Sequence, residues 1–391
     1  MRKNGVNREL TEISGGVCAP SGFTACAVQF ENLKNKKTEN VGFIFGKRRF
    51  PSAYLGAQGA NASACVKISE KHLESGNAST IIVHNGLAIA QGAEEDKAVE
   101  TICRAGAKYF NIDRNDIIFA SIGALGGKTF VEAFEQAFKD CAHKKLPVKK
   151  DSFAVATAIN KNAPREVAFS FNIGDWICKI GAVFTNGEEG KLCLLTTDVK
   201  ISSKMLKKAL NHVANEYFYM TPTKCGDNPH DCICITASEE AQNWRIEDEN
   251  ADYDKFVYAL ASVMDIICRQ MATQGKVEEK LCLCKVIGAK SKRSARQTAF
   301  STLSLLRNSG FSVQNILRAV LSVDEMVNLE KLSVSVVGED RTFVLYEDGA
   351  SFSFIESTIN QVFQAEKIEI LINLQLGNYS ATAFGGLADK E

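Results

Sequence analysis

A short strand-like run holds the side chains of this sequence best suited to attack a carbonyl group. Cys193, Thr196 and Thr197 lie in the apolar, β-prone run 192–197, which follows the loop 186–190. A thiol or hydroxyl of this kind forms a covalent acyl intermediate when a nearby base removes its proton. The same run also suits a buried strand, whose alternate side chains point to opposite faces of a sheet. It is therefore either a site of acyl chemistry or a core strand.

A nucleophile needs a base, and the histidines supply no recognisable partner. His84 follows a strand-like run. The other histidines fall in predicted helices or loops: His72, His143, His212 and His230. None of them belongs to a familiar Ser–His or Cys–His motif. Most are expected to be ordinary surface or helix-cap residues.

Cysteines and a histidine also gather at two places where a metal site is worth testing. The groups are Cys225, His230, Cys232 and Cys234, and the pair Cys282 and Cys284. Structural zinc sites use Cys-x2–4-Cys spacing, which lets two thiolates reach one ion. Residues i and i+2 of a strand only share a face, which suits small buried thiols. We therefore expect no metal site and no cofactor.

A glycine-rich turn follows the strand-like run 117–121. Residues 122–129 read Ile-Gly-Ala-Leu-Gly-Gly-Lys-Thr, and they precede a helical pattern. The spacing of a phosphate-binding loop is not met, because residue 122 is not glycine. The remaining prediction is a strand-to-helix turn whose main-chain N–H groups could face an anion or an oxyanion.

The elements that position these residues alternate between strands and helices. Strands are predicted at 24–30, 41–45, 79–83, 117–121, 167–172, 176–180, 191–197, 231–235, 280–287, 332–337, 342–346 and 368–374, and helices at 94–107, 130–141, 203–216 and 253–271. The helix 253–271 is the clearest, because its apolar residues fall on one stripe. Mixed helices and hairpins favour an α+β layered fold over strict βαβ alternation.

Composition restricts the class of protein. The 391 residues are too many for one ordinary core, and the 46 basic residues balance the 46 acidic ones. We expect no nucleic-acid or membrane partner, and no export signal follows Met1. Thirteen cysteines at unpatterned spacings indicate reduced thiols in the cytoplasm.

Four short motifs occur in the same order as in one enzyme family. They are Val17–Phe23 (Val-Cys-Ala-Pro-Ser-Gly-Phe), Ala78–Gly86, Ala120–Gly126 (Ala-Ser-Ile-Gly-Ala-Leu-Gly) and Leu376–Gly385. They resemble the ornithine acetyltransferase/N-acetylglutamate synthase family of arginine biosynthesis, the ArgJ family. Its motifs read Val-Thr-Ala-Pro-x-Gly-Phe at the first place, Ala-Arg-Ala-Ile-Val-Val-Asn-Ser-Gly at the second and Ala-Ser-Thr-Gly-Val-Ile-Gly at the third. The resemblance extends over nearly the whole chain.

This resemblance implies an architecture. The family fold is a layered αββα sandwich of the ornithine acetyltransferase type with two lobes. Residues 1–190 would correspond to the family's α-chain and residues 191–391 to its β-chain. The family cleaves itself between the two, before a threonine that becomes the acyl-accepting nucleophile. We expect this chain to remain uncleaved.

The chain departs from the family at each part of that chemistry. Counted back from Thr196-Thr197-Asp198, the nucleophile position is Gly190, which has no hydroxyl. The oxyanion-hole threonine is Ile122, so only main-chain N–H groups remain near Ile122 and Gly123. Lys276 stands where the family has an acidic residue that contacts substrate. We also expect this chain to lack the polar contacts of the family's C-terminal tail.

Two functions follow from these departures. The first is a divergent member without self-cleavage or acetyltransferase activity, a pseudoenzyme that binds a small molecule or another protein. The alternative is a glutamate N-acetyltransferase or ornithine acetyltransferase-like enzyme with relocated residues, in which Cys193, Thr196 or Thr197 is the nucleophile. The expected partners are an amino-acid-derived small molecule and a second chain, in a homodimer or with an active homologue.

Overall fold

A computed structural model of the chain divides into two compact units. It describes residues 10–31, 36, 38–57, 62–89, 93–127, 131–143, 148–187, 190–223, 228–273, 279–323, 327–337, 342–352 and 367–388. The first unit contains residues 1–213 and 227–263, and the second contains 214–226 and 264–391. These units are defined by compactness. The predicted halves 1–190 and 191–391 are defined by the family's cleavage position, so they stay a prediction.

The first unit is built on a nine-stranded sheet in the order β1-β6-β7-β8-β9-β3-β4-β5, with β2 paired to β3. Its strands are β1 (Thr11–Glu12), β2 (Phe23–Glu31), β3 (Thr38–Gly56), β4 (Asn77–Ile89), β5 (Ile117–Gly127), β6 (Glu166–Ile173), β7 (Trp176–Gly187), β8 (Gly190–Thr197) and β9 (Cys232–Ala237).

Strand β3 divides this sheet into two layers. It pairs with β2 up to Gly46 and with β4 up to Pro51, whereas residues 52–56 pair with β9. The register with β4 shifts between Phe45 and Phe50. This irregularity bends the 19-residue strand, so that its first part belongs to one layer and its last part to the other. The layer β2–β3–β4–β5 therefore faces the layer that contains β6 to β9.

Two apolar clusters show what each layer covers. One joins Ile81, Ile118 and Ile122 of the first layer to Leu192 of the second, with residues of α4 (Ser152–Ile159). The other joins the opposite face of the first layer to three helices. These are α1 (Ala64–His72), α2 (Ala93–Phe110) and α3 (Val131–His143). The two clusters bury both faces of the first layer, the main source of its stability.

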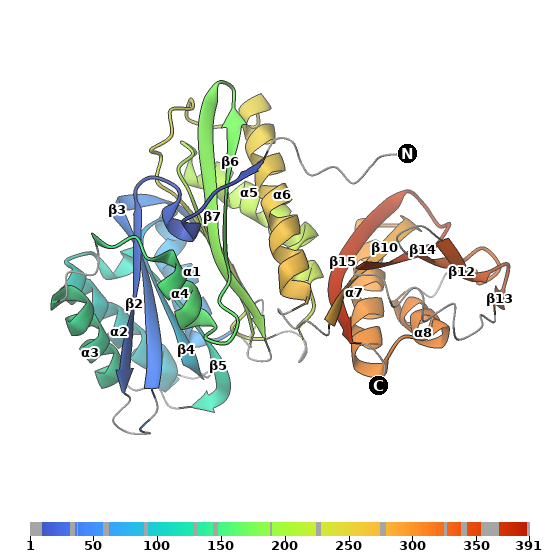
Figure 1. Cartoon of the computed structure of the whole chain (residues 1–391), viewed down its shortest axis with the longest axis horizontal. Helices are drawn as coiled ribbons and strands as arrows, with labels where there is room; N and C mark the ends of the chain where they lie inside the picture. The colour runs from blue at the N-terminus through green and yellow to red at the C-terminus, as the bar shows by residue number, and fades with distance from the viewer. Residues whose placement is uncertain are drawn as a thin grey trace. The chain divides into compact units, whose positions relative to one another are not determined.

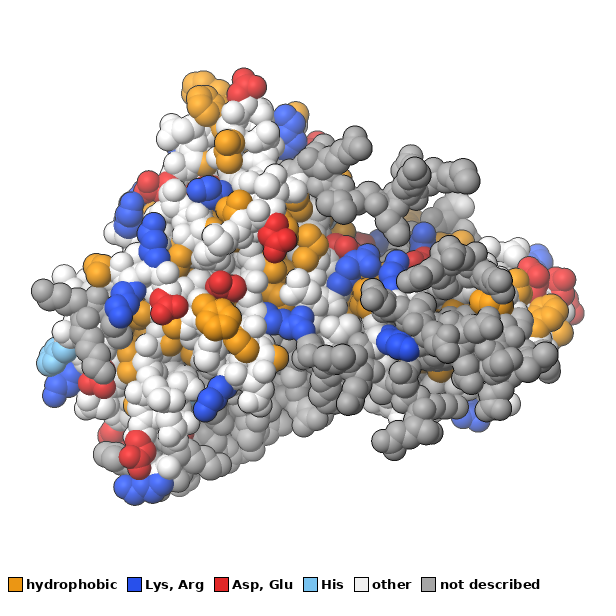
Figure 2. All heavy atoms as spheres, viewed as in Figure 1, with side chains coloured by type: hydrophobic (Ala, Val, Ile, Leu, Met, Phe, Trp, Pro, Cys, Tyr) orange, Lys and Arg blue, Asp and Glu red, His pale blue; other side chains and the backbone are white. Residues whose placement is uncertain are grey.

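The helices α5 (Ser203–Glu216) and α6 (Ala251–Ala272) lie on the outer face of the second layer, beside β6 and β7 in Figure 1. The layers of the first unit are therefore stacked in the order helices, sheet layer, sheet layer, helices. The predicted α+β fold, an αββα sandwich, is confirmed. Charged side chains of both signs are interspersed on the face in Figure 2, as the balanced composition leads one to expect.

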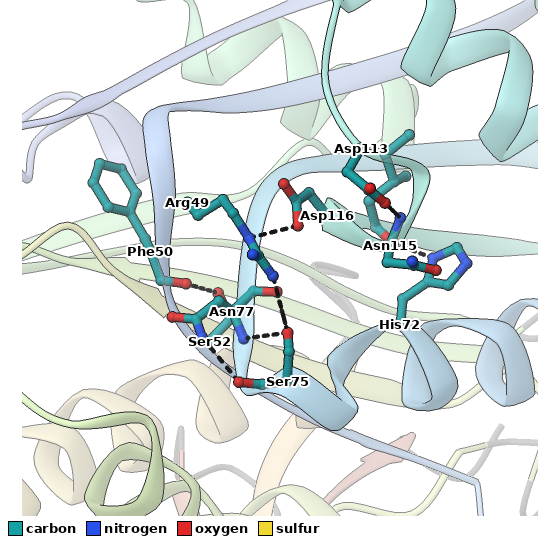
Figure 3. A network of polar contacts seen from close by, with 10 residues as sticks. Arg49, Phe50, Ser52, His72, Ser75, Asn77, Asp113, Asn115 and Asp116 are labelled. Atoms are coloured by element: carbon teal, nitrogen blue, oxygen red, sulfur yellow. Dashed lines mark hydrogen bonds and ion pairs between the residues drawn. The ribbon is translucent and has the colours of Figure 1, made fainter.

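A polar network fixes the start of β5 against the bend of β3, as Figure 3 shows. The Arg49 Nε atom lies 2.7 Å from Asp116 Oδ1, and its Nη2 donates to Ser75 Oγ at 3.2 Å. His72 Nδ1 lies 2.8 Å from the carbonyl oxygen of Ile117. These contacts hold α1 and the start of β5 in place. The prediction of a turn from residue 122 was wrong for residues 122–127, because β5 continues to Gly127 in register with β4.

The second unit has a six-stranded sheet in the order β13-β12-β11-β14-β10-β15. The strands are β10 (Glu279–Ala289), β11 (Ser333–Val337), β12 (Thr342–Glu347), β13 (Ala350–Ser351), β14 (Lys367–Asn373) and β15 (Tyr379–Ala388). Helix α7 (Lys292–Ser309) packs on β15 and β10, and α8 (Val313–Val323) packs on α7. Among the described residues, no helix is long and apolar enough to cross a membrane.

Candidate functional site

The position of the family nucleophile lies at the end of a tight hairpin. Strands β7 and β8 are paired up to Gly187 and Gly190, so only two residues connect them. Gly190 has a φ of +129°, a conformation that side-chain-bearing residues rarely adopt. A Cβ atom added there would lie 3.4 Å from Asn228 Cγ and 3.4 Å from Asp231 Oδ1. The position thus lacks a side chain and has a backbone conformation that favours glycine.

A buried charge pair surrounds this hairpin end. Asp231 Oδ1 accepts a hydrogen bond from the main-chain N–H of Lys191 at 2.7 Å. Its other oxygen lies 3.9 Å from Lys191 Nζ, and the two side chains are 8% and 4% exposed. Buried charges persist when they are paired and hydrogen-bonded. A cation and a carboxylate are therefore held directly beside Gly190.

His230 is the most unusual group near this pair. Its main-chain N–H donates to Asn228 Oδ1 at 3.0 Å. The side chain is buried, and neither ring nitrogen has a hydrogen-bond partner in the part of the chain that the structure describes. Burial lowers the pKa of His230 to about 4. The ring is therefore neutral at pH 7 and offers one donor and one acceptor.

Ile122 occupies the core between the two sheet layers. It is in register with Asn85 of β4 and belongs to the same apolar cluster as Val183 and Leu192. Leu192 of β8 therefore packs against the layer that contains Ile122. A Cβ atom at Gly190 would instead meet Asn228 and Asp231. Position 122 carries a buried alkyl group where the family motif has a threonine.

Comparison with known proteins identifies the family of the chain. The model of the ArgJ family matches residues 25–387. The chain belongs to the ArgJ family. Similar relatives are the arginine biosynthesis bifunctional protein ArgJ of Lactococcus lactis and the glutamate N-acetyltransferase of Methanothermobacter thermautotrophicus. Each is 25% identical; the first match covers 96% of both chains, and the second covers 96% of this chain and 95% of the relative.

Among solved structures, an ArgJ protein from Bacillus halodurans matches with 22% identity and a TM-score of 0.45, covering 51% of this chain and 93% of its own. An ornithine acetyltransferase from Mycobacterium tuberculosis matches with 19% identity and a TM-score of 0.36, covering 41% of this chain and 88% of its own.

The three candidate relocated nucleophiles of this ArgJ family chain are completely buried in β8. Thr196 Oγ1 donates to the carbonyl oxygen of Val17 at 2.8 Å. Thr197 Oγ1 donates to the carbonyl oxygen of Lys179 at 2.7 Å. Cys193 alternates with Leu192 and therefore faces away from the interior that holds Ile122. The hydroxyl protons of both threonines are used to tie β8 to its neighbours.

The remaining predicted positions lie elsewhere. Lys276 and Cys225 fall outside the described residues. Cys232 and Cys234 belong to the core between the layers, and Cys282 and Cys284 are fully buried in β10. Burial raises the pKa of the Cys284 thiol to about 12, which favours the thiol over the metal-binding thiolate. Within the described ranges, no three side chains form a group that could hold a metal ion.

The prediction that most histidines lie at the surface or at helix caps was wrong for two of them. His84 and His230 are buried. His72 is also buried, but it lies at the end of α1. His84 Nε2 lies 3.0 Å from Glu39 Oε2, and its Nδ1 lies 3.4 Å from Ser121 Oγ. The partners come from β3 and β5, far apart in sequence, so no local motif announces them. One indication of this contact was present in the sequence: His84 directly follows the predicted strand 79–83, and Ser121 ends the predicted strand 117–121.

Proposed function

We propose that this ArgJ family chain binds an N-acetylated amino acid at the start of β8, without self-cleavage and without a threonine nucleophile. The observation that carries the proposal is Gly190. An N→O acyl shift needs a hydroxyl or thiol at the residue after the broken bond, and glycine has neither. Gly190 therefore differs from the family's threonine in two ways: it has no hydroxyl, and its φ of +129° is a backbone conformation that favours glycine.

The groups beside Gly190 support the ligand class. Lys191 and Asp231 offer a cation and a carboxylate beside Gly190. His230, which precedes Asp231 in the sequence, has a buried neutral ring with one donor and one acceptor. A carboxylate and an amide, as in N-acetylornithine or N-acetylglutamate, complement such a set. Low exposure strengthens each of these interactions.

A second candidate is an acetyltransferase that moves the acetyl group of N-acetylornithine to glutamate by relocated residues. The relative named glutamate N-acetyltransferase, matched over 95% of its own length, favours this candidate. The comparisons thus favour the enzyme, whereas the geometry at position 190 favours the binding protein. In the second case the nucleophile must come from outside position 190, or the transfer must be direct.

Two measurements on the purified full chain separate the candidates. Calorimetry with N-acetylornithine and N-acetylglutamate measures binding, and mass spectrometry of N-acetylglutamate formed from glutamate measures transfer. The binding protein predicts a saturable signal and no turnover above the protein-free rate. Turnover would select the second candidate, and the absence of both signals would contradict the proposal.

A matched variant assigns the signal to the site. Asp231→Asn keeps an oxygen to accept from the Lys191 N–H and removes the negative charge beside Gly190. We expect affinity for the N-acetyl amino acid to change at least tenfold. Asp254→Asn, an exposed residue in the first turn of α6, is the charge-matched control and leaves affinity unchanged.

A further inference from the structure

A second constellation lies on the other face of the first sheet layer. Ser121, His84 and Glu39 come from β5, β4 and β3, and each is 7% exposed or less. His84 and Ser121 are direct register partners in the parallel pair of β4 and β5. The side chains therefore project to the same face. The ring of Phe134 on α3 packs edge-on against His84 at 5.0 Å, which places this face toward the helices.

The contacts connect an alcohol, an imidazole and a carboxylate in series. Ser121 Oγ lies 3.4 Å from His84 Nδ1, and Glu39 Oε2 lies 3.0 Å from His84 Nε2. An ionised Glu39 keeps a proton on Nε2 and leaves the Nδ1 lone pair directed at the serine hydroxyl. A nucleophile, a base and a group that orients the base are thus in hydrogen-bond reach of one another, which is the arrangement of a catalytic triad.

A serine nucleophile also needs a donor for the oxyanion. In hydrolases with a serine nucleophile, the N–H of the next residue commonly stabilises the oxyanion. The next residue here is Ile122, which lies within β5 in the motif that resembles the family's oxyanion loop. His84 also differs from that family, whose strand motif Val-Val-Asn-Ser-Gly has asparagine at the position of His84. A base therefore stands in this chain beside a serine, while the nucleophile at position 190 is absent.

We propose that Ser121 is an acyl-accepting nucleophile, with His84 as its base and Glu39 as the residue that positions His84. Ser121 Oγ attacks the carbonyl carbon of a small acyl ester, and its proton passes to His84 Nδ1. As the bond to the leaving group breaks, His84 gives this proton to the departing alkoxide, which leaves as the alcohol. Water then attacks the acyl-serine and gives a proton to His84, the bond between the acyl carbon and Oγ breaks, and His84 returns the proton to Oγ as the acid departs. The low exposure of Ser121 restricts the acyl group to a small one such as acetyl.

This proposal goes beyond the function proposed for Gly190, because it uses other residues on the opposite face of the sheet layer. Its test is 4-nitrophenyl acetate with the full chain. We expect a burst of nitrophenolate, and an acetyl group on Ser121 in peptides prepared after acid quenching. A small organophosphorus fluoride should label the same serine. Binding of N-acetyl amino acids is measured separately, so either proposal can fail alone.

Variants decide whether the contacts are catalytic. Ser121→Ala should abolish the acyl adduct. His84→Asn, which installs the family's residue, should slow acylation at least about 100-fold, the usual contribution of a general base. Glu39→Gln should slow it less, and Cys193→Ala should leave it unchanged. If Ser121→Ala does not fold, by circular dichroism, His84→Asn decides the question. Absence of an acyl-Ser121 peptide from the wild-type chain, or equal acylation of His84→Asn, overturns the proposal.

Discussion

At the scale of single residues, Gly190 combines two differences from a threonine nucleophile. The hydroxyl is absent, and the backbone has a φ of +129° in a two-residue hairpin. Space is not the obstacle, since an added Cβ would make ordinary contacts of 3.4 Å with Asn228 and Asp231. Returning a hydroxyl to this position therefore requires a different backbone as well as a different side chain.

Gly190→Thr should consequently fail to restore self-cleavage and should destabilise the chain. Holding a side-chain-bearing residue in a sparsely populated region costs about 1–3 kcal/mol. Urea unfolding measures the loss, and a denaturing gel measures cleavage. Gly190→Ala, which carries the same strain without a hydroxyl, should lose a similar amount. Two fragments from Gly190→Thr alone would show that the side chain was the only missing part.

His230 predicts a dependence of stability on pH. Burial lowers the pKa of His230 from 6.5 to about 4. Between these two pH values the ring is protonated in the unfolded chain and neutral in the folded chain. The lowered pKa of His230 does not affect the free energy of unfolding above pH 6.5. It decreases that free energy as the pH falls from about 6.5 to about 4. The loss is at most about 3 kcal/mol.

Urea unfolding at pH 7 and pH 5 tests this, with His230→Gln as the comparison. The variant should lose less stability than the wild type between the two values. An equal loss in both proteins would mean that His230 is not held neutral. A ligand that bonds to the ring should be bound more weakly by the variant.

The residue scale also shows where sequence reasoning ends. The glycine at 190 and the isoleucine at 122 could be read from motifs, because family positions are local in sequence. The contact of Glu39 with His84 spans 45 residues, and it depends on strand order. The sequence likewise did not predict that Asp231 lies beside Gly190.

At the scale of elements, β8 is held by side chains that resemble nucleophiles. Thr196→Val should cost about 1–3 kcal/mol, because the buried carbonyl of Val17 loses its donor. Ser79→Ala is the control, since the buried Ser79 hydroxyl has no partner among the described residues and its loss should cost less. Any acetyl transfer should survive both changes. Loss of transfer in Thr196→Val at unchanged stability would instead assign Thr196 to catalysis.

Periodicity predicted several elements within a few residues, but the helices α1 and α4 were not predicted. The helix expected at 203–216 is α5, Ser203–Glu216, and the strand expected at 191–197 is β8, Gly190–Thr197. The full length of β3 was not predicted, because Gly46 and Pro51 interrupt its apolar pattern. That strand runs on through both layers since its second part has a partner of its own in β9. Tertiary pairing overrode the local signals there.

At the scale of the whole molecule, the account requires a chain that stays in one piece. Strands β7 and β8 lie on either side of the family's cleavage position and are paired along their whole common length. Each is enclosed in a core that includes residues from both sides of position 190. Integrity of the sandwich therefore does not depend on cleavage. A dimer, with itself or with an active homologue, is an expectation that sedimentation of the purified chain checks.

Intact-mass spectrometry of the purified, denatured protein tests the central claim most directly. The account predicts one species at the full-chain mass of 42.7 kDa. Prolonged incubation at 37 °C should not change it. Two fragments that meet near residue 190, with threonine, serine or cysteine at the new N-terminus, would contradict the account.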